Sequence, residues 1–343
     1  MKRKKTKNIL HFTQFALPLY FGMQTTNLKV SFILTYYNQP VKMLRECLES
    51  ILVLSLRPYE REIIIIDDGS AESPINELLK YGDDIIYVRQ KNKGLSEARN
   101  LGMRMASGLY LQFIDADDYL NQAAYEHSLD LVRYNQPDMV VFDFSHHPTH
   151  GATFEDQGPL NGASLMKQQN IHGTACGYIF NRAILGTLRF TPNIYHEDEE
   201  FTPRLLLQAQ AVYRTNAKAY VYRKHKGTIT SKKDNRSKIK RLADKLYVIT
   251  SLRNMITTLP YNEQQAINRR VAQLTMDYIY NVIVQTRSRH YLERTLSLLQ
   301  REGLFPLPDK NYTTKYKWFR RLTNSNFGRK LLIRVLPLLK RER

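Results

Sequence analysis

Between Lys29 and Val141 the sequence alternates short apolar runs with helical patterns. The runs VSFILTY, EIIIID, IIYVRQ, LYLQFI and DMVVFDF are rich in β-branched and aromatic residues, which favour strands. Segments such as VKMLRECLESILVL separate them and carry the apolar spacing of one helix face. Strands that are apolar along their whole length and alternate with helices are typical of a parallel sheet covered on both faces. We therefore predict an α/β fold with an open, mostly parallel, Rossmann-like sheet.

The chain of 343 residues divides into three regions by composition. Residues 1–28 form a basic N-terminal extension, and residues 29–235 form the α/β domain. Residues 236–343 carry long amphipathic patterns, such as QQAINRRVAQLTMDYIYNVIV, and end in the basic tail NFGRKLLIRVLPLLKRER. We predict a helical C-terminal region with a basic amphipathic tail.

The net charge of +19 is concentrated at the two ends of the chain. No acidic residue precedes Glu46, and Glu342 is the only one after Asp309. Basic ends indicate an anionic partner, either nucleic acid, phosphorylated substrate or an anionic membrane surface. The tail fits a helix lying on a membrane, although Pro337 should kink it and it could instead pack on the protein.

The sequence predicts no transmembrane helix. The segment ILHFTQFALPLYFGM is too short to span a bilayer and lacks a small-residue cleavage site, and Met23 is an alternative start. Cys47 lies in an apolar helical pattern, so we expect a buried thiol rather than a disulfide. These features favour a cytoplasmic protein, peripheral at the inner face of the membrane.

Polar residues follow four successive strands of the predicted sheet. In an open parallel sheet, ligands bind beyond the carboxyl ends of the strands. We therefore expect these four strand ends to form a binding rim, although each alone could be simple turn chemistry. The four ends are TYYN from Thr35, DDGS from Asp67, NKGL from Asn92 and DADD from Asp115.

The two acidic strand ends suggest different roles. Asp115 and Asp117 are crowded, and oxygen ligands of this kind suit Mg²⁺ or Mn²⁺ together with substrate phosphates. Asp67 and Asp68 would then accept hydrogen bonds from a base or ribose, and Arg99 would meet an anion. The chain has neither GxxxxGK[ST] nor GxGxxG, which excludes a P-loop NTPase and argues against a dinucleotide oxidoreductase.

Taken in order, the motifs TYYN, IIIIDDGS, NKGLSEARNLGM and FIDADD resemble the nucleotide-binding half of glycosyltransferase family 2 over residues 29–231. The resemblance implies a GT-A fold with a mixed sheet. It also implies an inverting enzyme that takes a nucleotide-diphosphate sugar, a UDP-sugar by preference, with Mn²⁺ or Mg²⁺. The acceptor would be a glycan or a lipid-diphosphate-linked saccharide in surface polysaccharide synthesis.

The resemblance also implies roles for individual residues at the rim. It places Asp67 and Asp68 at the base and ribose, Arg99 near the diphosphate, and Asp118 as the cap of the following helix. Metal ligands would be Asp117, Asp115 and His225. The implied nucleotide-sugar contacts are Thr35, Tyr37, Asn38, Asp67, Asp68, Asn92, Gly94, Arg99, Asp115 and Ala116.

A second acidic cluster, YHEDEEF, precedes the helical pattern RLLLQAQAV. It could be a first helical turn favoured by the helix dipole. It also resembles the motif that supplies the family's catalytic base, which implies Asp198 as the base and Glu197 as its substitute. We expect Glu199 and Glu200 to face solvent. The stretch HGTACG, from His172, resembles the family's acceptor-side loop.

The segment YRKHKGTIT, from Tyr222, resembles the family's flexible segment over the diphosphate, where Arg223 and Lys226 would offset charge. Two other functions remain possible on the sequence. The basic ends could bind nucleic acid, which the acidic rim makes unlikely. A nucleotidyltransferase would also pair an α/β domain with metal-bound aspartates, but its Gly-rich phosphate loop near the first strand is missing.

Overall fold

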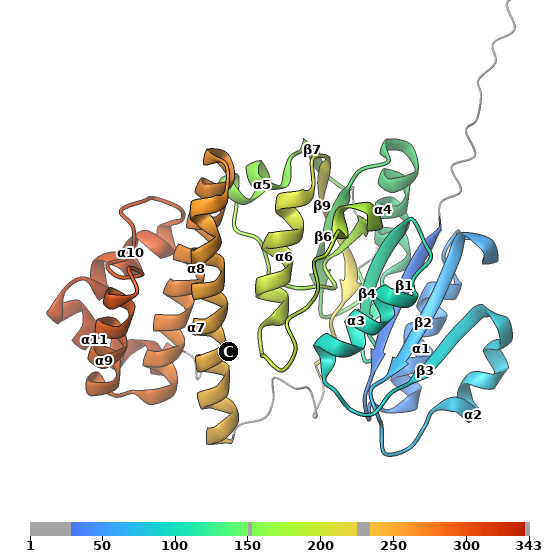
Figure 1. Cartoon of the computed structure of the whole chain (residues 1–343), viewed down its shortest axis with the longest axis horizontal. Helices are drawn as coiled ribbons and strands as arrows, with labels where there is room; N and C mark the ends of the chain where they lie inside the picture. The colour runs from blue at the N-terminus through green and yellow to red at the C-terminus, as the bar shows by residue number, and fades with distance from the viewer. Residues whose placement is uncertain (1–28, 150–152, 225–233, 340–343) are drawn as a thin grey trace, which may run out of the picture.

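The computed structural model describes residues 29–149, 153–224 and 234–339. Figure 1 shows a sheet-containing part, which carries the N-terminal strands, beside a stack of helices from the C-terminal third of the chain. His225 and Lys226 lie outside the described residues. No helix in the described ranges is long and apolar enough to cross a membrane.

In the described part of the chain, nine strands form one mixed sheet in the order β3-β2-β1-β4-β8-β6-β9-β5, with β7 paired to β9. The first four in this order are parallel neighbours, while β8 is antiparallel to both β4 and β6. Since β6 pairs parallel with β9, six strands point the same way and the predicted mostly parallel sheet is confirmed. The strands are β1 (Val30–Tyr36), β2 (Arg61–Asp67), β3 (Ile85–Arg89), β4 (Tyr110–Asp115), β5 (Tyr119–Leu120), β6 (Met139–Ser145), β7 (Asp156–Leu160), β8 (Tyr178–Asn181) and β9 (Val212–Val221).

Helices cover the sheet and bury the apolar faces that the sequence patterns indicated. Helix α1 buries Leu44, Cys47, Leu48 and Ile51, so the expected buried thiol is confirmed. The four isoleucines of β2 have no exposed surface, because helices pack over that strand on the inner part of the sheet. The helices of this part are α1 (Val41–Leu52), α2 (Ile75–Leu78), α3 (Leu95–Met105), α4 (Gln122–Asn135), α5 (Gly162–Gln168) and α6 (Glu197–Gln208).

The C-terminal region is helical, as predicted. Helices α7 and α8 are long, lie side by side, and pack on α5 and α6. In Figure 1, α6 lies between this helical region and the strands. The position of α6 matters, because its first turn carries the acidic cluster. The helices of the region are α7 (Asn235–Met255), α8 (Tyr261–Thr286), α9 (Arg289–Arg301), α10 (Thr314–Thr323) and α11 (Asn326–Leu339).

Candidate active site

The carboxyl ends of β1, β2 and β4 lie at one edge of the sheet. The parallel register sets Tyr36 opposite Asp67 and Thr35 opposite Asp115. The same register brings Asp67 opposite Arg89 at the end of β3. The predicted rim therefore exists, and two acidic strand ends flank β1 within it.

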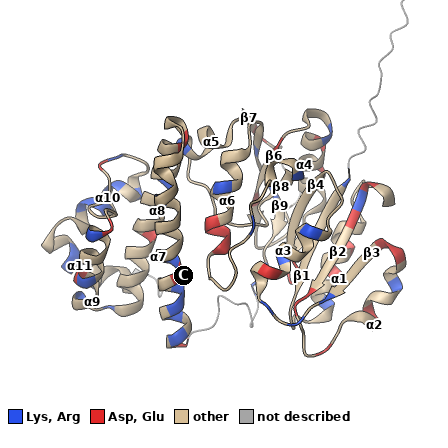
Figure 2. Cartoon of the chain, in the orientation of Figure 1, with Lys and Arg blue, Asp and Glu red and all other residues tan. Residues whose placement is uncertain are grey.

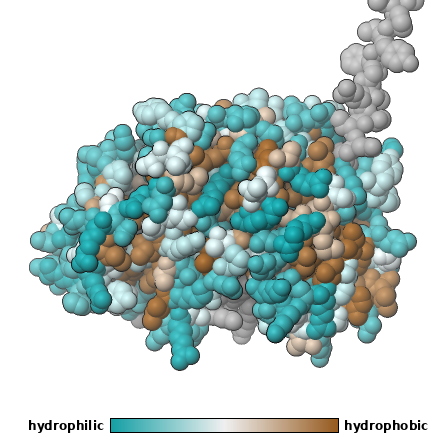
Figure 3. Space-filling view, in the orientation of Figure 1, coloured by the Kyte–Doolittle hydropathy of each residue, from teal (hydrophilic) through white to brown (hydrophobic). Residues whose placement is uncertain are grey.

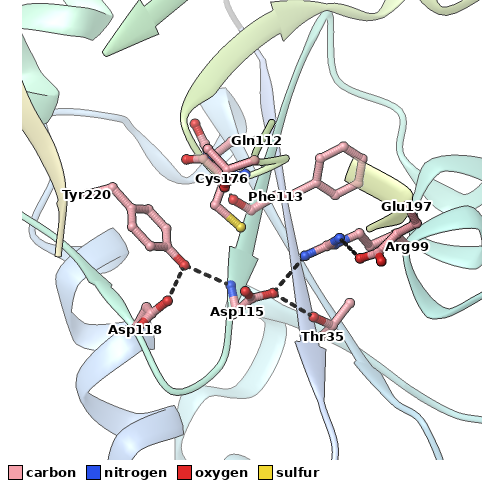
Figure 4. A network of polar contacts seen from close by, with 10 residues as sticks. Thr35, Arg99, Gln112, Phe113, Asp115, Asp118, Cys176, Glu197 and Tyr220 are labelled. Atoms are coloured by element: carbon pink, nitrogen blue, oxygen red, sulfur yellow. Dashed lines mark hydrogen bonds and ion pairs between the residues drawn. The ribbon is translucent and has the colours of Figure 1, made fainter. Parts of the chain in front are cut away.

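Arg99 on α3 connects this rim to the acidic turn of α6 (Figure 4). The side chain is 3% exposed. Its Nη2 lies 3.0 Å from Asp115 Oδ1, and its Nη1 lies 2.9 Å from Glu197 Oε1. Thr35 also donates to Asp115 Oδ1, at 3.3 Å. Burial alone would lower the pKa of Arg99, but the nearby acids, Asp115 foremost, raise it above its ordinary value. A permanent cation therefore joins Asp115 to Glu197, which lies 98 positions after Arg99 in the chain.

Asp118 is buried and holds the end of β9 against the rim. The Tyr220 hydroxyl donates to Asp118 Oδ2 at 2.7 Å, and the Arg223 N–H donates to Oδ1 at 2.8 Å. The same hydroxyl accepts the Asp115 N–H at 3.2 Å. Burial, together with the charge of Asp115, raises the pKa of Asp118 to about 8.

These contacts overturn the expected role of Asp118 as a helix cap. Helix α4 begins at Gln122, with Asn121 at the cap position. Asp118 instead fixes the junction of β4 and β9, because its carboxylate is satisfied by partners from β9 and the following loop.

All four acids of the cluster lie in the first turn of α6, where the helix dipole favours negative charge. The prediction that Glu199 and Glu200 face solvent is wrong. Glu199 pairs with Arg270 of α8, and Glu200 is 3% exposed. Glu200 accepts from Ser251 at 2.8 Å and pairs with Arg204 at 2.9 Å. The turn is thus fixed by cations and hydroxyls, which compensate the burial of its acids.

Asp198 lies between Glu197, which contacts Arg99, and Glu199, which contacts Arg270. It is partly buried, and its Oδ1 accepts the Glu199 N–H at 2.9 Å. Burial and the adjacent charge of Glu197 raise the pKa of Asp198 to about 8, against the opposing effect of Arg99. A carboxylate with a pKa near neutrality can both take and release a proton under physiological conditions.

Asp67 and Asp68 both accept hydrogen bonds from other residues of the chain. Asp67 has no exposed surface and accepts from the Ser70 N–H and the Tyr87 hydroxyl, both at 2.8 Å. Asp68 accepts the backbone N–H groups of Lys93 and Gly94, at 2.9 and 2.8 Å. Both carboxylates hold the rim loops in place in this conformation, and the contacts to base and ribose stay predictions.

The remaining nucleotide-pocket residues lie around the same loops. Tyr37 is 48% exposed, and Asn38 has a left-handed backbone with φ 57°. Its Oδ1 accepts the Ala71 N–H at 2.8 Å, which ties the end of β1 to the loop after β2. Gly69, with φ 77°, allows close packing of that loop, because a Cβ there would lie 2.7 Å from the Asn92 nitrogen. These contacts hold the loops after β1, β2 and β3 close to one another.

The other predicted contacts are Asn92, Gly94 and Ala116. Asn92 is exposed, and Gly94 with φ 87° is the cap position of α3. Ala116 is buried, and its N–H donates to the Thr35 carbonyl at 3.1 Å. Contacts of these residues to a nucleotide stay predictions.

The predicted metal ligands are only partly brought together. Asp115 and Asp117 are both partly buried at the end of β4, and His225 lies outside the described residues. No group of three or more His, Cys, Asp or Glu side chains capable of holding a metal ion occurs within the described ranges. Two carboxylates nevertheless suit Mg²⁺ or Mn²⁺, which commonly take their other ligands from substrate phosphates and water.

The loop after α5 borders the acidic turn. A Cβ at Gly173 would collide with the carboxylate of Glu199, so the glycine allows the loop to approach the Glu199–Arg270 pair. A cavity of about 40 Å³ lies between this loop, β6 and α6, and Phe144, His172 and Tyr178 are among its lining residues. Thr202, one turn after Asp198, also lines it and lies 3.1 Å from the Tyr178 hydroxyl.

Tyr220 and Arg270 were not identified from the sequence as residues of the site. Tyr220 joins Asp115 to Asp118, but one tyrosine among several near the end of β9 gives no separate signal. Arg270 holds Glu199 from α8, where it is 3% exposed. Its position between Ile267 and Val271, on an apolar helix face, was a usable signal for a buried cation.

Comparison with known proteins finds similarity to glycosyltransferases. Residues 31–185 match a family model described as glycosyl transferase family 2. The chain is 27% identical to glycosyltransferase GlyA of Streptococcus pneumoniae over 59% of this chain and 31% of that protein. It is 28% identical to the uncharacterized glycosyltransferase EpsJ of Bacillus subtilis, over 59% of this chain and 62% of that protein. The alignments thus leave more than a third of each relative unmatched.

A structural likeness covers nearly the whole chain. The crystal structure of S. aureus TarS 1-349 in complex with UDP-GlcNAc superposes with a TM-score of 0.61 and 17% identity, over 92% of both chains. At this identity the likeness shows the fold. It confirms the GT-A type of fold and extends into the helical C-terminal region. These comparisons favour a glycosyltransferase over the nucleic-acid binder and the nucleotidyltransferase.

Proposed function

Since residues 31–185 belong to glycosyl transferase family 2, we propose that this protein transfers a sugar from a nucleotide-diphosphate donor to a hydroxyl group, with inversion at the anomeric carbon. The observation that carries the proposal is the bridge made by Arg99. One buried guanidinium contacts Asp115 on the donor rim and Glu197 in the acidic turn, at 3.0 and 2.9 Å. The candidate base is thereby held beside the strand ends where a donor would bind.

Asp198 is the proposed general base. The acceptor oxygen forms a bond to the anomeric carbon while the bond from that carbon to the donor's phosphate oxygen breaks. The acceptor proton passes to the Asp198 carboxylate, and the nucleoside diphosphate leaves. The raised pKa of about 8 suits this step, because a base works best when its pKa is near the operating pH. Glu197 would assist by its charge, although Arg99 already occupies one of its oxygens.

Mn²⁺ or Mg²⁺ is the proposed cofactor, held by Asp117 and Asp115, with His225 as a further ligand. When bound, such an ion offsets the negative charge of the leaving diphosphate. The chain's own residues set the geometry around it. The Tyr220 hydroxyl and Thr35 fix the end of β4 from two sides, at 3.2 and 3.3 Å.

The donor is proposed to be a UDP-sugar, which the fold shared with TarS bound to UDP-GlcNAc supports. The acceptor is proposed to be a glycan or a lipid-diphosphate-linked saccharide used in surface polysaccharide synthesis, at the cytoplasmic face of a membrane.

The test is a panel of UDP-, GDP- and dTDP-sugars incubated with the full chain and Mn²⁺ or Mg²⁺. We expect one donor to release its nucleoside diphosphate and the corresponding nucleoside diphosphate to raise the melting temperature. The proposal fails if no donor is turned over and no nucleoside diphosphate binds with either metal.

A further inference from the structure

Helix α11 presents apolar residues on two opposite faces. Its inner face packs on the helical region, where Gly328, Leu332 and Pro337 are buried. Its outer face carries four large apolar side chains spaced i, i+4, i+8 and i+11, the spacing of one helix stripe. We call this set the outer stripe: Phe327, Leu331, Val335 and Leu338, which are 78%, 41%, 38% and 61% exposed. A helix that had only to pack on the protein would need the inner face alone.

Basic residues flank the outer stripe. Lys330 and Arg334 are exposed and lie three residues after Phe327 and Leu331. Residues 310–343 contain eleven Lys and Arg, and Glu342 is their only acid. In Figure 2 Lys and Arg gather on α10 and α11, and Figure 3 shows apolar residues reaching the surface in the helical region among hydrophilic ones.

The neighbouring helix α10 repeats this combination. It packs on α11 and carries Trp318, which is 58% exposed. Lys315 and Arg321, three residues to either side, are also exposed. Tryptophan and basic residues together on an exposed helix are typical of proteins that sit at a lipid–water interface.

We propose that the outer stripe of α11 docks on an anionic lipid bilayer, with Lys330 and Arg334 at the headgroups and the four apolar side chains among the upper acyl chains. The lipid headgroups then pair with the basic residues, and the acyl chains cover the apolar side chains. A hydrated polyanion would pair with the cations but leave the stripe in water. This docking surface is independent of the proposed sugar transfer, since it shares no residue with the candidate active site.

Other occupants of the stripe fit its charge less well. A second copy of the chain would bring the same cations against Lys330 and Arg334. Residues 1–28 contain five Lys and Arg and no acid, so they would also be repelled. Anionic lipid headgroups are the complementary partner, and such binding weakens with added salt because exposed charges are screened.

The first experiment is cosedimentation of the full chain with vesicles. We expect binding to vesicles of phosphatidylcholine and phosphatidylglycerol, little binding to phosphatidylcholine alone, and weaker binding in high salt. The double variant Leu331→Gln with Val335→Gln should lower vesicle affinity at least tenfold, and Lys330→Glu with Arg334→Glu should do the same. Matched controls are Val53→Gln, directly after α1, and Arg104→Glu on α3, both at exposed positions, which should bind as the wild type does.

A second experiment locates the contact. The chain has one tryptophan, Trp318, so Trp318→Phe with Phe327→Trp moves the only indole onto the outer stripe. Its emission should shift to the blue with anionic vesicles and stay unchanged with neutral ones. The proposal is overturned if the indole shows no shift, or if the two apolar substitutions leave vesicle binding unchanged. It is equally overturned if those substitutions dissociate a dimer of a protein that binds no vesicles.

Discussion

Arg99 and Asp115 lie on different elements, α3 and β4, and their side chains meet at 3.0 Å inside the domain. The other terminal nitrogen of the guanidinium holds Glu197 at 2.9 Å. Because both nitrogens are used, one buried cation links the acidic turn to the rim.

Replacing Arg99 by Met should destabilise the fold by about 3 kcal/mol, because the buried Glu197 and the partly buried Asp115 lose their cation. Urea unfolding at neutral pH measures this. Arg99→Lys should recover only part of the loss, since an ammonium group cannot bridge two carboxylates as a planar fork does. Arg104→Met on the exposed side of the same helix is the control and should change stability by less than about 0.5 kcal/mol. Equal effects at the two positions would contradict the bridging role.

The contribution of Asp118 to stability should fall as the pH rises from about 4 to about 8. The pKa of Asp118 is about 8 in the folded chain, against an ordinary value of 3.8. The folded state therefore keeps a proton that the unfolded state releases over this range, so deprotonation favours unfolding. Asp198 contributes in the same direction.

Asp118→Asn isolates the contribution of Asp118. The amide resembles the protonated acid, because its oxygen can accept from the Arg223 N–H and its NH₂ can donate to Tyr220. The variant should lose less stability than the wild type between pH 5 and pH 9 in urea unfolding. A variant as pH-sensitive as the wild type would show that Asp118 titrates normally.

Tyr220→Phe should cost about 1 to 3 kcal/mol, since it leaves the buried Asp115 N–H and the Asp118 carboxylate without a shared partner. The control is Tyr213→Phe on the same strand, whose hydroxyl bonds Asn135 in an exposed position. In thermal unfolding, the melting temperature of Tyr220→Phe should be clearly lower than that of Tyr213→Phe. If Tyr220→Phe is as stable as Tyr213→Phe, the hydroxyl does not hold the junction.

Arg270→Met should lower transfer activity by about 100-fold while donor affinity stays within a factor of about three, because a displaced acidic turn misplaces the base without altering the rim. Initial rates and nucleotide titration measure the two quantities. Arg270→Lys should restore part of the rate. A loss of donor affinity equal to the loss of rate would contradict this separation.

The sequence predicted the parts of the fold that depend on local pattern. Periodicity located VSFILTY as β1 to the residue, and the acidic strand ends were expected at one rim because parallel strands share an edge. The burial of Glu200 could not be predicted in this way. An acidic first turn reads as solvent-facing unless the chain brings Arg204, Ser251 and Arg270 to it, and two of these come from the C-terminal helices.

The pH dependence of transfer should follow Asp198. The base works only when ionised, so the rate should rise with pH and level off above a pKa of about 8. A pH–rate profile at saturating donor measures it. A profile that is flat from pH 6 to pH 9 would argue against Asp198 as the titrating base.

Asp198→Asn tests the central claim most directly, because it removes the proton acceptor and keeps the side-chain volume. The measurement combines the initial rate of sugar transfer with calorimetric binding of the nucleoside diphosphate in the presence of Mn²⁺. We predict a loss of rate of about 10² to 10⁴, with nucleotide affinity close to that of the wild type. A variant that transfers sugar at the wild-type rate would contradict the account.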